Sequence, residues 1–485
     1  MKSLKEILFN VPILKIIGTT ELEVSHITFD SRNIRLNTLF IAQKGTATDG
    51  HLFIDDAIKK GANAIICQEL PNNINSNVTY ILVNDSDLAL SFVASNYFDH
   101  PSGKLKLVGI TGTNGKTTLA TLSHDLFQNS GINTGLISTV VIKIGEKEYP
   151  TSHTTPDALT INHYLHQMII AGVTHCFMEV SSHGIQQKRT EALHFVGGVF
   201  TNLTHDHLDY HETFANYRDV KKSFFDKLLK TSFALSNIDD KNGKVMLQNT
   251  KAIKRTYALK TMADYKAKIV ENRIEGLHLQ IDGFEVWSKL IGNFNAYNLL
   301  AIYAIAKELG LESLEILRII SLLDSVRGRF QYFISDSGVT TIVDYAHTPD
   351  ALLNVLQTIQ EVRNGNEKVL TIVGCGGNRD KTKRPMMAKI ASQMSNTAIF
   401  TSDNPRFEDP KQIIAEMEAG VSKENYHKTL SIIDRKEAIK AANKMVNEGD
   451  IVLIAGKGHE TYQEINGVKY DFDDVKIAKE IFNNN

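Results

Sequence analysis

A glycine-rich segment that ends in Lys-Thr-Thr is the strongest chemical signal in the chain. Residues 109–118 read GITGTNGKTT, between an apolar run at 106–111 and a helical pattern at 119–128. In that context backbone amides can surround phosphate oxygens, a lysine can reach the outer phosphates and a threonine hydroxyl can bind magnesium. Ile110 stands where the GxxxxGK[ST] pattern expects its first glycine. Nucleotide binding is nevertheless favoured over a turn that merely joins a strand to a helix.

Possible metal ligands lie at or beyond the ends of two other apolar runs. Glu179 lies in the run 175–180, and His207 follows the run 198–203. Carboxylate and imidazole ligands beside a phosphate loop suit a magnesium ion that is held jointly with substrate oxygens. Zinc bound by His205, His207 and His211 is an alternative, but this spacing fits no common zinc motif.

These residues are positioned by an alternation of strands and helices that predicts an α/β protein of three domains. Residues 1–98 form a small α/β domain, with β-like runs at 38–42, 64–67 and 79–83. Residues 99–325 form a P-loop-type domain with a mostly parallel sheet, whose strands lie at 106–111, 175–180, 198–203 and 233–236. Residues 326–485 form a Rossmann-like domain with strands at 340–343, 369–373, 398–401 and 451–454. Since ligands bind beyond the carboxyl ends of parallel strands, we expect the active site between the last two domains.

Composition excludes several classes of function. Basic and acidic side chains number 53 and 55, so no net charge favours nucleic acid or an anionic membrane as a partner. Three scattered cysteines form no CxxC pair, which favours a reducing cytoplasm. No apolar stretch approaches the about 20 residues that cross a bilayer. We interpret residues 1–17 as a short amphipathic helix.

The segment TGTNGKTT resembles the phosphate loop of Mur ligases and of folylpolyglutamate synthetases. Those enzymes use ATP to convert a carboxylate into an acyl phosphate, which an amine then attacks. The resemblance therefore implies ATP as co-substrate and Mg²⁺ as cofactor. It assigns ATP binding to Gly112, Thr113, Asn114, Gly115, Lys116, Thr117 and Thr118, and catalysis to Lys116, Glu179, His207 and Lys221.

Tyr217 and Lys221 match the YxxxK motif of Mur ligases. In that family the lysine is carboxylated to a carbamate, N6-carboxylysine, which helps to position magnesium. The resemblance thus implies a metal site made by Thr117, Glu179, His207 and Lys221. Taken alone, Lys221 is one lysine beside Lys222 on a helix, and a solvated helix face is the simpler interpretation.

The segment GNFNAYN, which begins at Gly292, resembles the family pattern GxHNxxN with Phe294 in place of histidine. The resemblance assigns Asn295 to the nucleotide. The alternative is a helix capped by Asn293 or Asn295, because asparagine often satisfies free amides at that position.

Two residues near the start of the last domain also match nucleotide-binding positions of the family. They are Arg329 in the predicted linker and Asp344 in the segment VDYAHTPD. The resemblance implies that both hold the nucleotide as the last domain closes. A solvated arginine and a helix-capping aspartate are the alternatives.

The first domain contains DSR at 30–32 and LFIAQKG at 39–45, which resemble the uridine-binding signature of two Mur ligases. A uridine-binding domain before the phosphate loop separates Mur ligases from folate ligases. The resemblance assigns the UDP-N-acetylmuramoyl peptide to Ser31, Thr154, Thr155, Ser181, Gln187 and Arg189.

The segment DNPR at 403–406 resembles the signature of Mur ligases that use meso-diaminopimelate. An arginine can grip the carboxylate at the far end of this diamino acid, whereas it would repel the terminal ammonium of lysine. The resemblance assigns diaminopimelate to Arg379, Asp403, Asn404, Pro405, Arg406, Gly456 and Glu460. An ordinary Asn-Pro turn is the simpler alternative.

The resemblance as a whole implies an ATP-dependent amide ligase of peptidoglycan synthesis. It would add meso-2,6-diaminopimelate to the D-glutamate side chain of UDP-N-acetylmuramoyl-L-alanyl-D-glutamate. We expect a cytoplasmic monomer whose partners are its small-molecule substrates. The alternatives are the same ligase using L-lysine, a folylpolyglutamate-type ligase, and a nucleotide-binding protein without catalysis.

Overall fold

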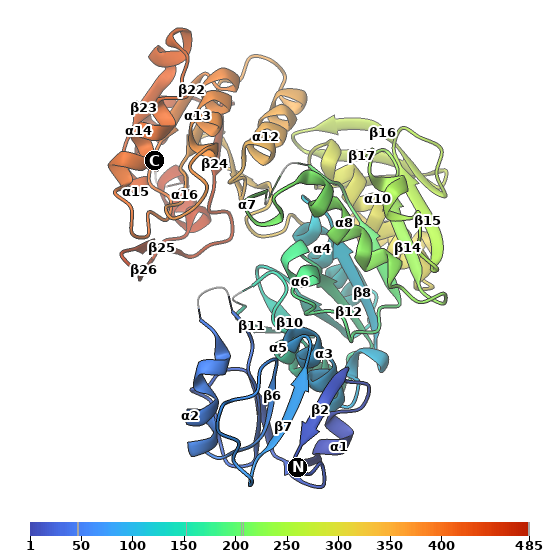
Figure 1. Cartoon of the computed structure of the whole chain (residues 1–485). Helices are drawn as coiled ribbons and strands as arrows, with labels where there is room; N and C mark the ends of the chain where they lie inside the picture. Colours follow the sequence, from blue (N-terminus) through green and yellow to red (C-terminus); the bar gives the residue numbers. More distant parts are fainter. Residues whose placement is uncertain (46–47, 152, 205, 207, 484–485) are drawn as a thin grey trace.

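The computed structural model describes residues 1–45, 48–151, 153–204, 206 and 208–483. Within these residues the chain forms three large sheets, of five, eleven and six strands, and two ribbons of two strands. Figure 1 shows each large sheet in its own domain, with the N-terminal domain at the bottom, the central domain at the right and the C-terminal domain at the upper left. The predicted α/β architecture of three domains is confirmed.

The N-terminal sheet has the strand order β2-β7-β6-β5-β4 and is parallel except for β2. Its strands are β2 (Ile13–Ile17), β4 (His26–Thr28), β5 (Thr38–Ile41), β6 (Ala62–Cys67) and β7 (Thr79–Val83). Strands β1 (Lys2–Ser3) and β3 (Glu23–Val24) form a separate ribbon, and the helices are α1 (Leu4–Ile7), η1 (Gly50–Phe53), α2 (Ile54–Lys59) and α3 (Ser86–Tyr97).

The prediction of one helix at the N-terminus is wrong beyond α1. Residues Ile13–Ile17 instead pair antiparallel with β7. Pro12 lacks the amide hydrogen that a continuing helix needs, and the isoleucines that follow are β-branched and favour a strand. The segment was correctly identified as apolar, but a helical instead of a strand periodicity was assigned to residues 13–17.

The central sheet has the order β11-β10-β9-β12-β8-β13-β14-β15-β16-β17-β18. Its strands are β8 (Lys106–Thr111), β9 (Thr134–Ile137), β10 (Ile142–Ile144), β11 (Lys147–Tyr149), β12 (His175–Glu179), β13 (Gly197–Phe200), β14 (Phe233–Asn237), β15 (Ile253–Ala258), β16 (Tyr265–Arg273), β17 (Gly276–Ile281) and β18 (Phe284–Ser288). Its helices are η2 (Pro101–Gly103), α4 (Lys116–Asn129), α5 (Ala158–Ile170), α6 (Ser182–Gln186), α7 (Leu208–His211), α8 (Phe214–Asp226), α9 (Gly243–Met246), α10 (Asn293–Glu308) and α11 (Ser313–Ile320). The middle of the sheet is parallel, as predicted, and antiparallel hairpins extend both edges.

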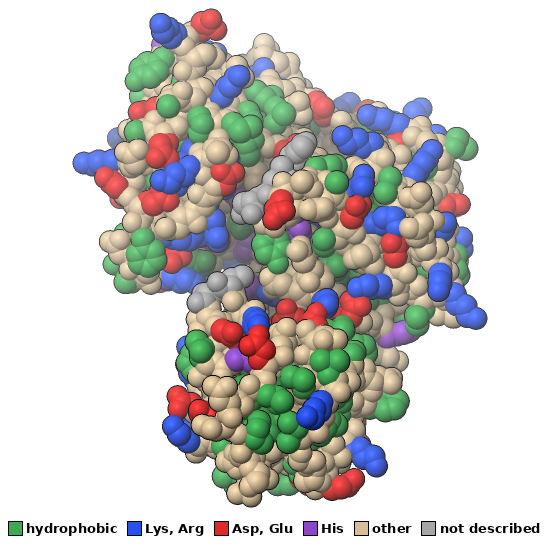
Figure 2. Space-filling view, viewed as in Figure 1, with side chains coloured by type: hydrophobic (Ala, Val, Ile, Leu, Met, Phe, Trp, Pro, Cys, Tyr) green, Lys and Arg blue, Asp and Glu red, His purple; other side chains and the backbone are tan. Residues whose placement is uncertain are grey.

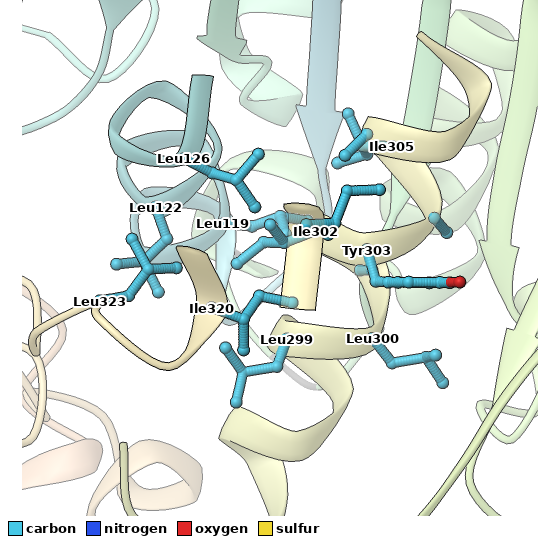
Figure 3. Packing of buried hydrophobic residues seen from close by; sticks show 14 of the residues in the cluster. Leu119, Leu122, Leu126, Leu299, Leu300, Ile302, Tyr303, Ile305, Ile320 and Leu323 are labelled. Atoms are coloured by element: carbon cyan, nitrogen blue, oxygen red, sulfur yellow. The ribbon is translucent and has the colours of Figure 1, made fainter. Parts of the chain in front are cut away.

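Helices cover both faces of the central sheet, because successive residues of a strand point to opposite faces. Val108 of β8 packs in the cluster that contains α4, α10 and α11, whereas Leu107 packs in the cluster that contains α5 and α8. Figure 3 shows leucines of α4 packed against aliphatic side chains of α10 and against Ile320 of α11. Each buried leucine contributes roughly 1.5–3 kcal/mol. This packing fixes α4, which carries the phosphate loop at its N-terminus.

The C-terminal sheet has the order β19-β20-β24-β21-β22-β23 and is parallel except for β19. Its strands are β19 (Gln331–Ile334), β20 (Thr340–Asp344), β21 (Val369–Val373), β22 (Thr397–Phe400), β23 (Thr429–Ser431) and β24 (Ile451–Ala455), and β25 (Tyr462–Ile465) and β26 (Val468–Asp471) form a hairpin. The helices are α12 (Pro349–Val362), α13 (Lys383–Met394), α14 (Pro410–Glu418), η3 (Lys423–Lys428), α15 (Arg435–Met445) and α16 (Asp474–Asn483). The predicted domain boundaries after residues 98 and 325 stay predictions.

The three cysteines are free and buried, one in each domain: Cys67, Cys176 and Cys375. No helix in the described part of the chain combines the length and the apolar character needed to span a bilayer.

Candidate active site

The loop between β8 and α4 has the backbone shape of a phosphate loop. Gly112 and Gly115 have positive φ angles of 150° and 89°, which glycine adopts most readily. A Cβ atom on Gly112 would lie 1.9 Å from Oγ1 of Thr201, so a larger residue does not fit there. Helix α4 begins at Lys116, three residues earlier than predicted, and the Lys116 Nζ donates to the carbonyl oxygens of Gly112 (3.0 Å) and Thr113 (2.8 Å). Helix amides and an ammonium therefore converge where an anion can bind.

Glu179 and Thr117 bring oxygen atoms to the same place. Glu179 ends β12, next to β8 in the sheet, and is completely buried. Its Oε2 accepts hydrogen bonds from Oγ1 of Thr117 (3.0 Å) and Oγ1 of Thr139 (3.2 Å), and its Oε1 accepts one from the Thr139 amide (2.7 Å). A carboxylate and a hydroxyl beside a phosphate loop are a donor set that fits Mg²⁺.

Lys221 lies inside the site, on α8. It is 1% exposed, so the alternative of a solvated helix face is wrong. Its Nζ donates to the carbonyl oxygen of Gly112 (2.9 Å) and lies 4.7 Å from the ring centre of Tyr217, whose hydroxyl is 3.1 Å from Oγ1 of Thr113. Burial, together with the positive charge of Lys116, holds the pKa of Lys221 well below its usual value.

The histidines of the predicted metal site are only partly described. His205 and His207 lie outside the described residues, so the magnesium and zinc hypotheses that depend on them stay predictions. His211 is buried on α7, where its ring centre lies 5.1 Å from that of Tyr217.

Asn295 is buried at the start of α10. It contacts Asn298, which in turn lies beside the phosphate loop. The N-terminal cap of α10 is Gly292, and no side chain caps the helix, so the capping alternative is wrong. The Asn295 Nδ2 donates to the carbonyl oxygen of Ile291 (2.8 Å), and its Oδ1 accepts from Nδ2 of Asn298 (3.0 Å). Oδ1 of Asn298 lies 3.0 Å from where a Cβ on Gly115 would be. The two asparagines therefore link α10 to the loop.

Arg329 reaches from the linker into the central domain, which contradicts the alternative of a solvated arginine. Its Nη2 donates to Oγ1 of Thr117 (3.2 Å), and its guanidinium lies 4.5 Å from the ring centre of Tyr345. Asp344 ends β20, and its Oδ2 accepts from the amide that follows Arg329 (2.6 Å). Burial raises the pKa of Asp344, and the charge of Arg329 opposes this rise. The cap of the following helix is Thr348, so Asp344 does not have that role.

Helix α12 of the C-terminal domain also contacts the phosphate loop. Oδ2 of Asp350 accepts hydrogen bonds from Nδ2 of Asn114 (3.2 Å) and from Oγ1 of Thr204 (2.9 Å). Figure 1 shows α12 on the side of its domain that faces the central domain, and Figure 2 shows the surface hollowed where the domains approach, with histidine side chains at its edge. The predicted nucleotide-binding residues thus come from both domains.

Five of the six residues predicted for the muramoyl peptide lie together beside Glu179. They are Thr154, Thr155, Ser181, Gln187 and Arg189. Oγ1 of Thr155 donates to the Glu179 carbonyl (2.9 Å) and accepts from the Ser181 amide (2.9 Å). Arg189 donates to the carbonyl of Thr155 and to Oε1 of Gln187. Hydroxyls and a guanidinium beside a phosphate loop can bind an anionic substrate.

Ser31, the sixth residue, is placed in the N-terminal domain after β4. Among the described residues its carbonyl oxygen accepts from Nζ of Lys60 (2.9 Å), and it is not part of the cluster beside Glu179. The N-terminal and central domains meet at Lys188. Its ammonium pairs with Asp85, and its carbonyl oxygen accepts a hydrogen bond from the Ser91 hydroxyl. Ser31 therefore remains a predicted contact to a different part of the substrate.

The residues predicted for diaminopimelate follow three adjacent strands. Strands β24, β21 and β22 are neighbours in the C-terminal sheet and run parallel, so their carboxyl ends share one edge. At this edge lie Arg379 after β21, Asp403, Asn404, Pro405 and Arg406 after β22, and Gly456 and Glu460 after β24.

Two arginines approach each other at this edge. Nη1 of Arg406 donates to the Gly377 carbonyl (2.8 Å), and its Nε lies 3.4 Å from Oε2 of Glu464. Nη1 of Arg406 and Cγ of Arg379 lie 3.0 Å and 3.8 Å from the point that a Cβ on Gly376 would occupy. The absence of a side chain at Gly376 leaves room for both, and a carboxylate could bind between them.

Carboxylates lie beside the arginines on the neighbouring loops. Oδ2 of Asp403 lies 2.7 Å from the position of a Cβ on Gly456, and Oε2 of Glu460 accepts from Nδ2 of Asn404 (2.7 Å). Burial and the nearby Asp403 raise the pKa of Glu460, while Lys457 opposes the rise. The edge therefore offers both positive and negative groups to a zwitterion.

Three family models match successive parts of the chain. They are the Mur ligase family, catalytic domain (residues 23–98), the Mur ligase middle domain (110–306) and the Mur ligase, glutamate ligase domain (328–458). A UDP-N-acetylmuramoyl-L-alanyl-D-glutamate–2,6-diaminopimelate ligase from Cytophaga hutchinsonii is 53% identical over 479 residues, which cover 99% of this chain and 98% of that protein. The chain belongs to the Mur ligase family.

Further relatives of this Mur ligase agree. The ligase of the same description from Bacteroides fragilis is 52% identical over 479 residues, with 99% of each chain covered. A solved structure of a ligase of that description has a TM-score of 0.70 at 32% identity and covers 99% of this chain and 98% of that one.

Sequence reasoning missed four residues of this Mur ligase. They are Asn298 and Asp350 beside the phosphate loop, and Lys457 and Glu464 in the C-terminal pocket. Asn298 could have been found as the second asparagine of the GxHNxxN pattern. Asp350 ends the segment VDYAHTPD and Lys457 lies between Gly456 and Glu460, so both stand next to predicted site residues. A lysine or carboxylate on a loop is usually solvated, however, and only packing between distant segments places these two side chains and Glu464 in a site.

Proposed function

We propose that this Mur ligase joins meso-2,6-diaminopimelate to the D-glutamate side-chain carboxylate of UDP-N-acetylmuramoyl-L-alanyl-D-glutamate, at the expense of ATP, in a cytoplasmic step of peptidoglycan synthesis. The observation that carries the proposal is that Arg406 and Glu460 lie on loops at one edge of the C-terminal sheet. Diaminopimelate differs from other diamines in that its far end bears both a carboxylate and an ammonium. An arginine and a glutamate on adjacent loops complement that end.

In the first step a glutamate oxygen of the substrate attacks the γ-phosphorus of ATP, and the bond to the ADP oxygen breaks. Lys116 and the amides at the start of α4 bind the phosphates and offset the charge that develops on them. Arg329 donates to Thr117 beside this loop, so it is poised to contact the same phosphates from the C-terminal side. The products are ADP and an acyl phosphate.

Thr117 and Glu179, with His207 and a carboxylated Lys221, are the residues that would hold Mg²⁺. The ion would supply charge neutralisation at the phosphate oxygens. The lowered pKa of Lys221 favours carboxylation, because only an unprotonated amine has the lone pair that attacks carbon dioxide. The resulting carbamate would place an anion next to Gly112 and release one proton.

In the second step the free amine of diaminopimelate attacks the acyl carbon, a C–N bond forms and phosphate leaves. The contacts of Arg406 and Glu460 with the far end would hold the reacting amine at the domain interface. Orientation of two reactants in this way removes much of the entropic barrier. Closure of the C-terminal domain over the phosphate loop excludes water, which would otherwise hydrolyse the acyl phosphate.

The direct test supplies purified protein with ATP, Mg²⁺ and the UDP-linked dipeptide, and offers diaminopimelate and L-lysine in parallel. Mass spectrometry should detect the diaminopimelate product and ADP release that depends on the amine. A lysine product alone would favour the lysine-adding alternative, and ATP cleavage supported only by a pteroate compound would favour a folate-type ligase. ADP release that never depends on an amine would favour a protein without ligase activity.

Replacing Arg406 by alanine tests the proposed selectivity. A hydrogen-bonded charge contributes roughly 1.5–3 kcal/mol, so KM for diaminopimelate should rise about 10- to 100-fold while KM for ATP stays near the wild-type value. Arg318→Ala is the matched control, because the guanidinium of Arg318 forms an exposed pair with Glu315 on α11, away from the proposed pocket. An unchanged KM for diaminopimelate in Arg406→Ala would remove the basis of the selectivity.

A further inference from the structure

Lys457 is a completely buried lysine in the loop after β24. Its side chain is 0% exposed, and a lysine is almost never fully buried unless it has a charged partner. Its Nζ donates to Oδ1 of Asn404 (3.0 Å) and to Oε2 of Glu460 (3.1 Å), and lies 5.6 Å from the ring centre of Tyr462. The ammonium thus lies behind two residues of the proposed diaminopimelate pocket.

Asn404 uses both ends of its amide in the same network. Its Nδ2 donates to Oε2 of Glu460 (2.7 Å), and its Oδ1 accepts from Nζ of Lys457 and from the amide of Glu464 (2.9 Å). A donor and an acceptor that are both engaged fix the orientation of the amide group. Lys457 is the only charged donor among these contacts, and it connects the loop after β22 to the loop after β24.

The carboxylate of Glu460 keeps one oxygen available. Both Lys457 and Asn404 donate to its Oε2, and among the described residues none donates to Oε1. The side chain remains 17% exposed. An incoming ammonium can therefore approach Oε1 from solvent while Oε2 is held from behind.

We infer that Lys457 is a positioning residue that orients Glu460 and Asn404 to receive the ammonium at the far end of the incoming amino acid. The inference rests on the proposed function, because it takes diaminopimelate as that amino acid. Lys457 does not contact the reacting atoms. It acts through the carboxylate of Glu460.

The charges of the pocket agree with this role. Asp403, Glu460 and Lys457 together carry one negative charge, which an ammonium would neutralise. Without Lys457, two partly buried carboxylates would repel each other, and Asp403 already raises the pKa of Glu460. Glu460 would then tend to bind a proton, and a neutral acid attracts an ammonium far less. Lys457 therefore preserves the charge as well as the orientation of Glu460.

The first experiment compares Lys457→Met with Lys469→Met in the full-length ligase. Lys469 lies 4.1 Å from the same Tyr462 ring but is exposed on β26, so it controls for loss of a lysine near that ring. In Lys457→Met, KM for diaminopimelate should rise about 10- to 100-fold, while KM for ATP and for the UDP-linked dipeptide stay near wild type. Lys469→Met should leave all three values unchanged.

The second experiment separates positioning from a merely structural role. In 2-aminopimelate the reacting amine and the far carboxylate are present but the far amine is missing. Wild type should prefer diaminopimelate to 2-aminopimelate, and Lys457→Met should lose most of this preference. The double variant Lys457→Met/Glu460→Gln should prefer diaminopimelate to 2-aminopimelate no less than Glu460→Gln alone does. The reason is that the two changes disrupt the same interaction with the far ammonium.

Equal loss of activity toward both amines, or an equal rise in KM for ATP, would overturn the inference. If thermal melting shows that Lys457→Met does not fold, Lys457→Gln is tested in its place, since it keeps one donor to Asn404. The same two results decide the question for that variant. Failure of wild type to ligate either amine would instead overturn the proposed function, so the two failures are distinguishable.

Discussion

At the scale of single residues, burial changes the chemistry of the lysines in this protein. Lys221 and Lys222 are adjacent on α8 and both are largely buried, but their partners differ. Lys222 pairs with Asp226 at 2.6 Å. Lys221 faces a carbonyl oxygen and the charge of Lys116, and its pKa is lowered well below the usual value. Lys222 thus has a carboxylate as its partner, whereas the lowered pKa of Lys221 favours the amine form that can react.

This difference predicts opposite outcomes for two alanine variants. Lys221→Ala should lower kcat by about two orders of magnitude or more, as expected when transition-state charge loses a stabilising group, and small carboxylates such as acetate should restore part of it. Lys222→Ala should retain most activity. Intact-protein mass spectrometry should also find the mass of one carbon dioxide on wild type and Lys222→Ala but not on Lys221→Ala. Full activity of Lys221→Ala would contradict the carbamate role.

At the scale of elements, the parts of the fold that could be predicted are those encoded locally. Apolar runs that end in glycine or polar residues correctly located the parallel strands of the central and C-terminal sheets. The run predicted at 198–203 ends as a strand at Phe200, which frees Thr201 to contact the phosphate loop. The strand at Ile13–Ile17 was mistaken for a helix, and hairpins β16–β18 and β25–β26 were not predicted. Their register and partners depend on residues distant in sequence.

The site was predictable to a similar degree. Lys116 and Glu179 lie at the carboxyl ends of β8 and β12 in the central sheet, and Arg406 lies beyond the end of β22 in the C-terminal sheet, so the edge on which each one lies could be inferred from topology alone. The orientation of Lys457 and the contact of Asp350 could not, because each depends on the packing of two segments that are far apart in the chain.

Arg384 of α13 connects several elements beneath the C-terminal pocket. It is 0% exposed, and it donates to Glu408 (2.9 Å), to Glu416 of α14 (2.6 Å) and to the carbonyl of Gly376 (3.2 Å). Because Gly376 borders Arg406, this ion-pair cluster supports the proposed selectivity pocket from behind.

Arg384→Met should therefore destabilise the protein. Removing one partner of a buried ion pair costs about 3–5 kcal/mol, which calorimetry should record as an earlier melting transition. Arg318→Ala, at an exposed pair, should cost less than about 1 kcal/mol. Similar melting temperatures for wild type, Arg384→Met and Arg318→Ala would show that the ion-pair cluster contributes little to stability.

The same cluster predicts a dependence on pH. Arg384 holds the pKa of Glu408 at about 2, against an ordinary value of 4.5. A lowered carboxylate pKa stabilises the fold fully above 4.5, and this contribution is lost as the pH falls from 4.5 toward 2. The difference in melting temperature between wild type and Arg384→Met should shrink over that range. A difference in melting temperature that does not change with pH over that range would contradict the role assigned to the Arg384–Glu408 ion pair.

At the scale of the whole molecule, the C-terminal domain touches the phosphate loop through two separate elements. The linker contributes Arg329, and α12 contributes Asp350. Thr348 caps α12 and Pro349 begins it, so the first turn that carries Asp350 is well defined. Each contact is a hydrogen bond to a charged group, which contributes roughly 1.5–3 kcal/mol. Away from the loop, Nδ2 of Asn293 also donates to Oε2 of Glu361 on α12 (2.8 Å).

Asp350→Ala should shift the unliganded protein toward more open arrangements. The loss of bonds to Asn114 and Thr204 should raise the radius of gyration that small-angle scattering measures, and saturating ATP analogue should reduce this increase. Asn354→Ala is the control, since Asn354 also donates to Asp350 but lies within α12. Equal radii for Asp350→Ala and wild type would show that the bonds of Asp350 do not control the separation of the domains.

The burial of one cysteine in each domain has a practical consequence for studying how each domain opens by local unfolding. Burial raises the pKa of Cys67 to about 11 and of Cys375 to about 12, and that of Cys176 is raised as well. Since the thiolate is the reactive form, each thiol is protected for as long as its own domain stays folded. Alkylation kinetics followed by peptide mapping can therefore time the opening of all three domains in parallel, in the unmodified chain.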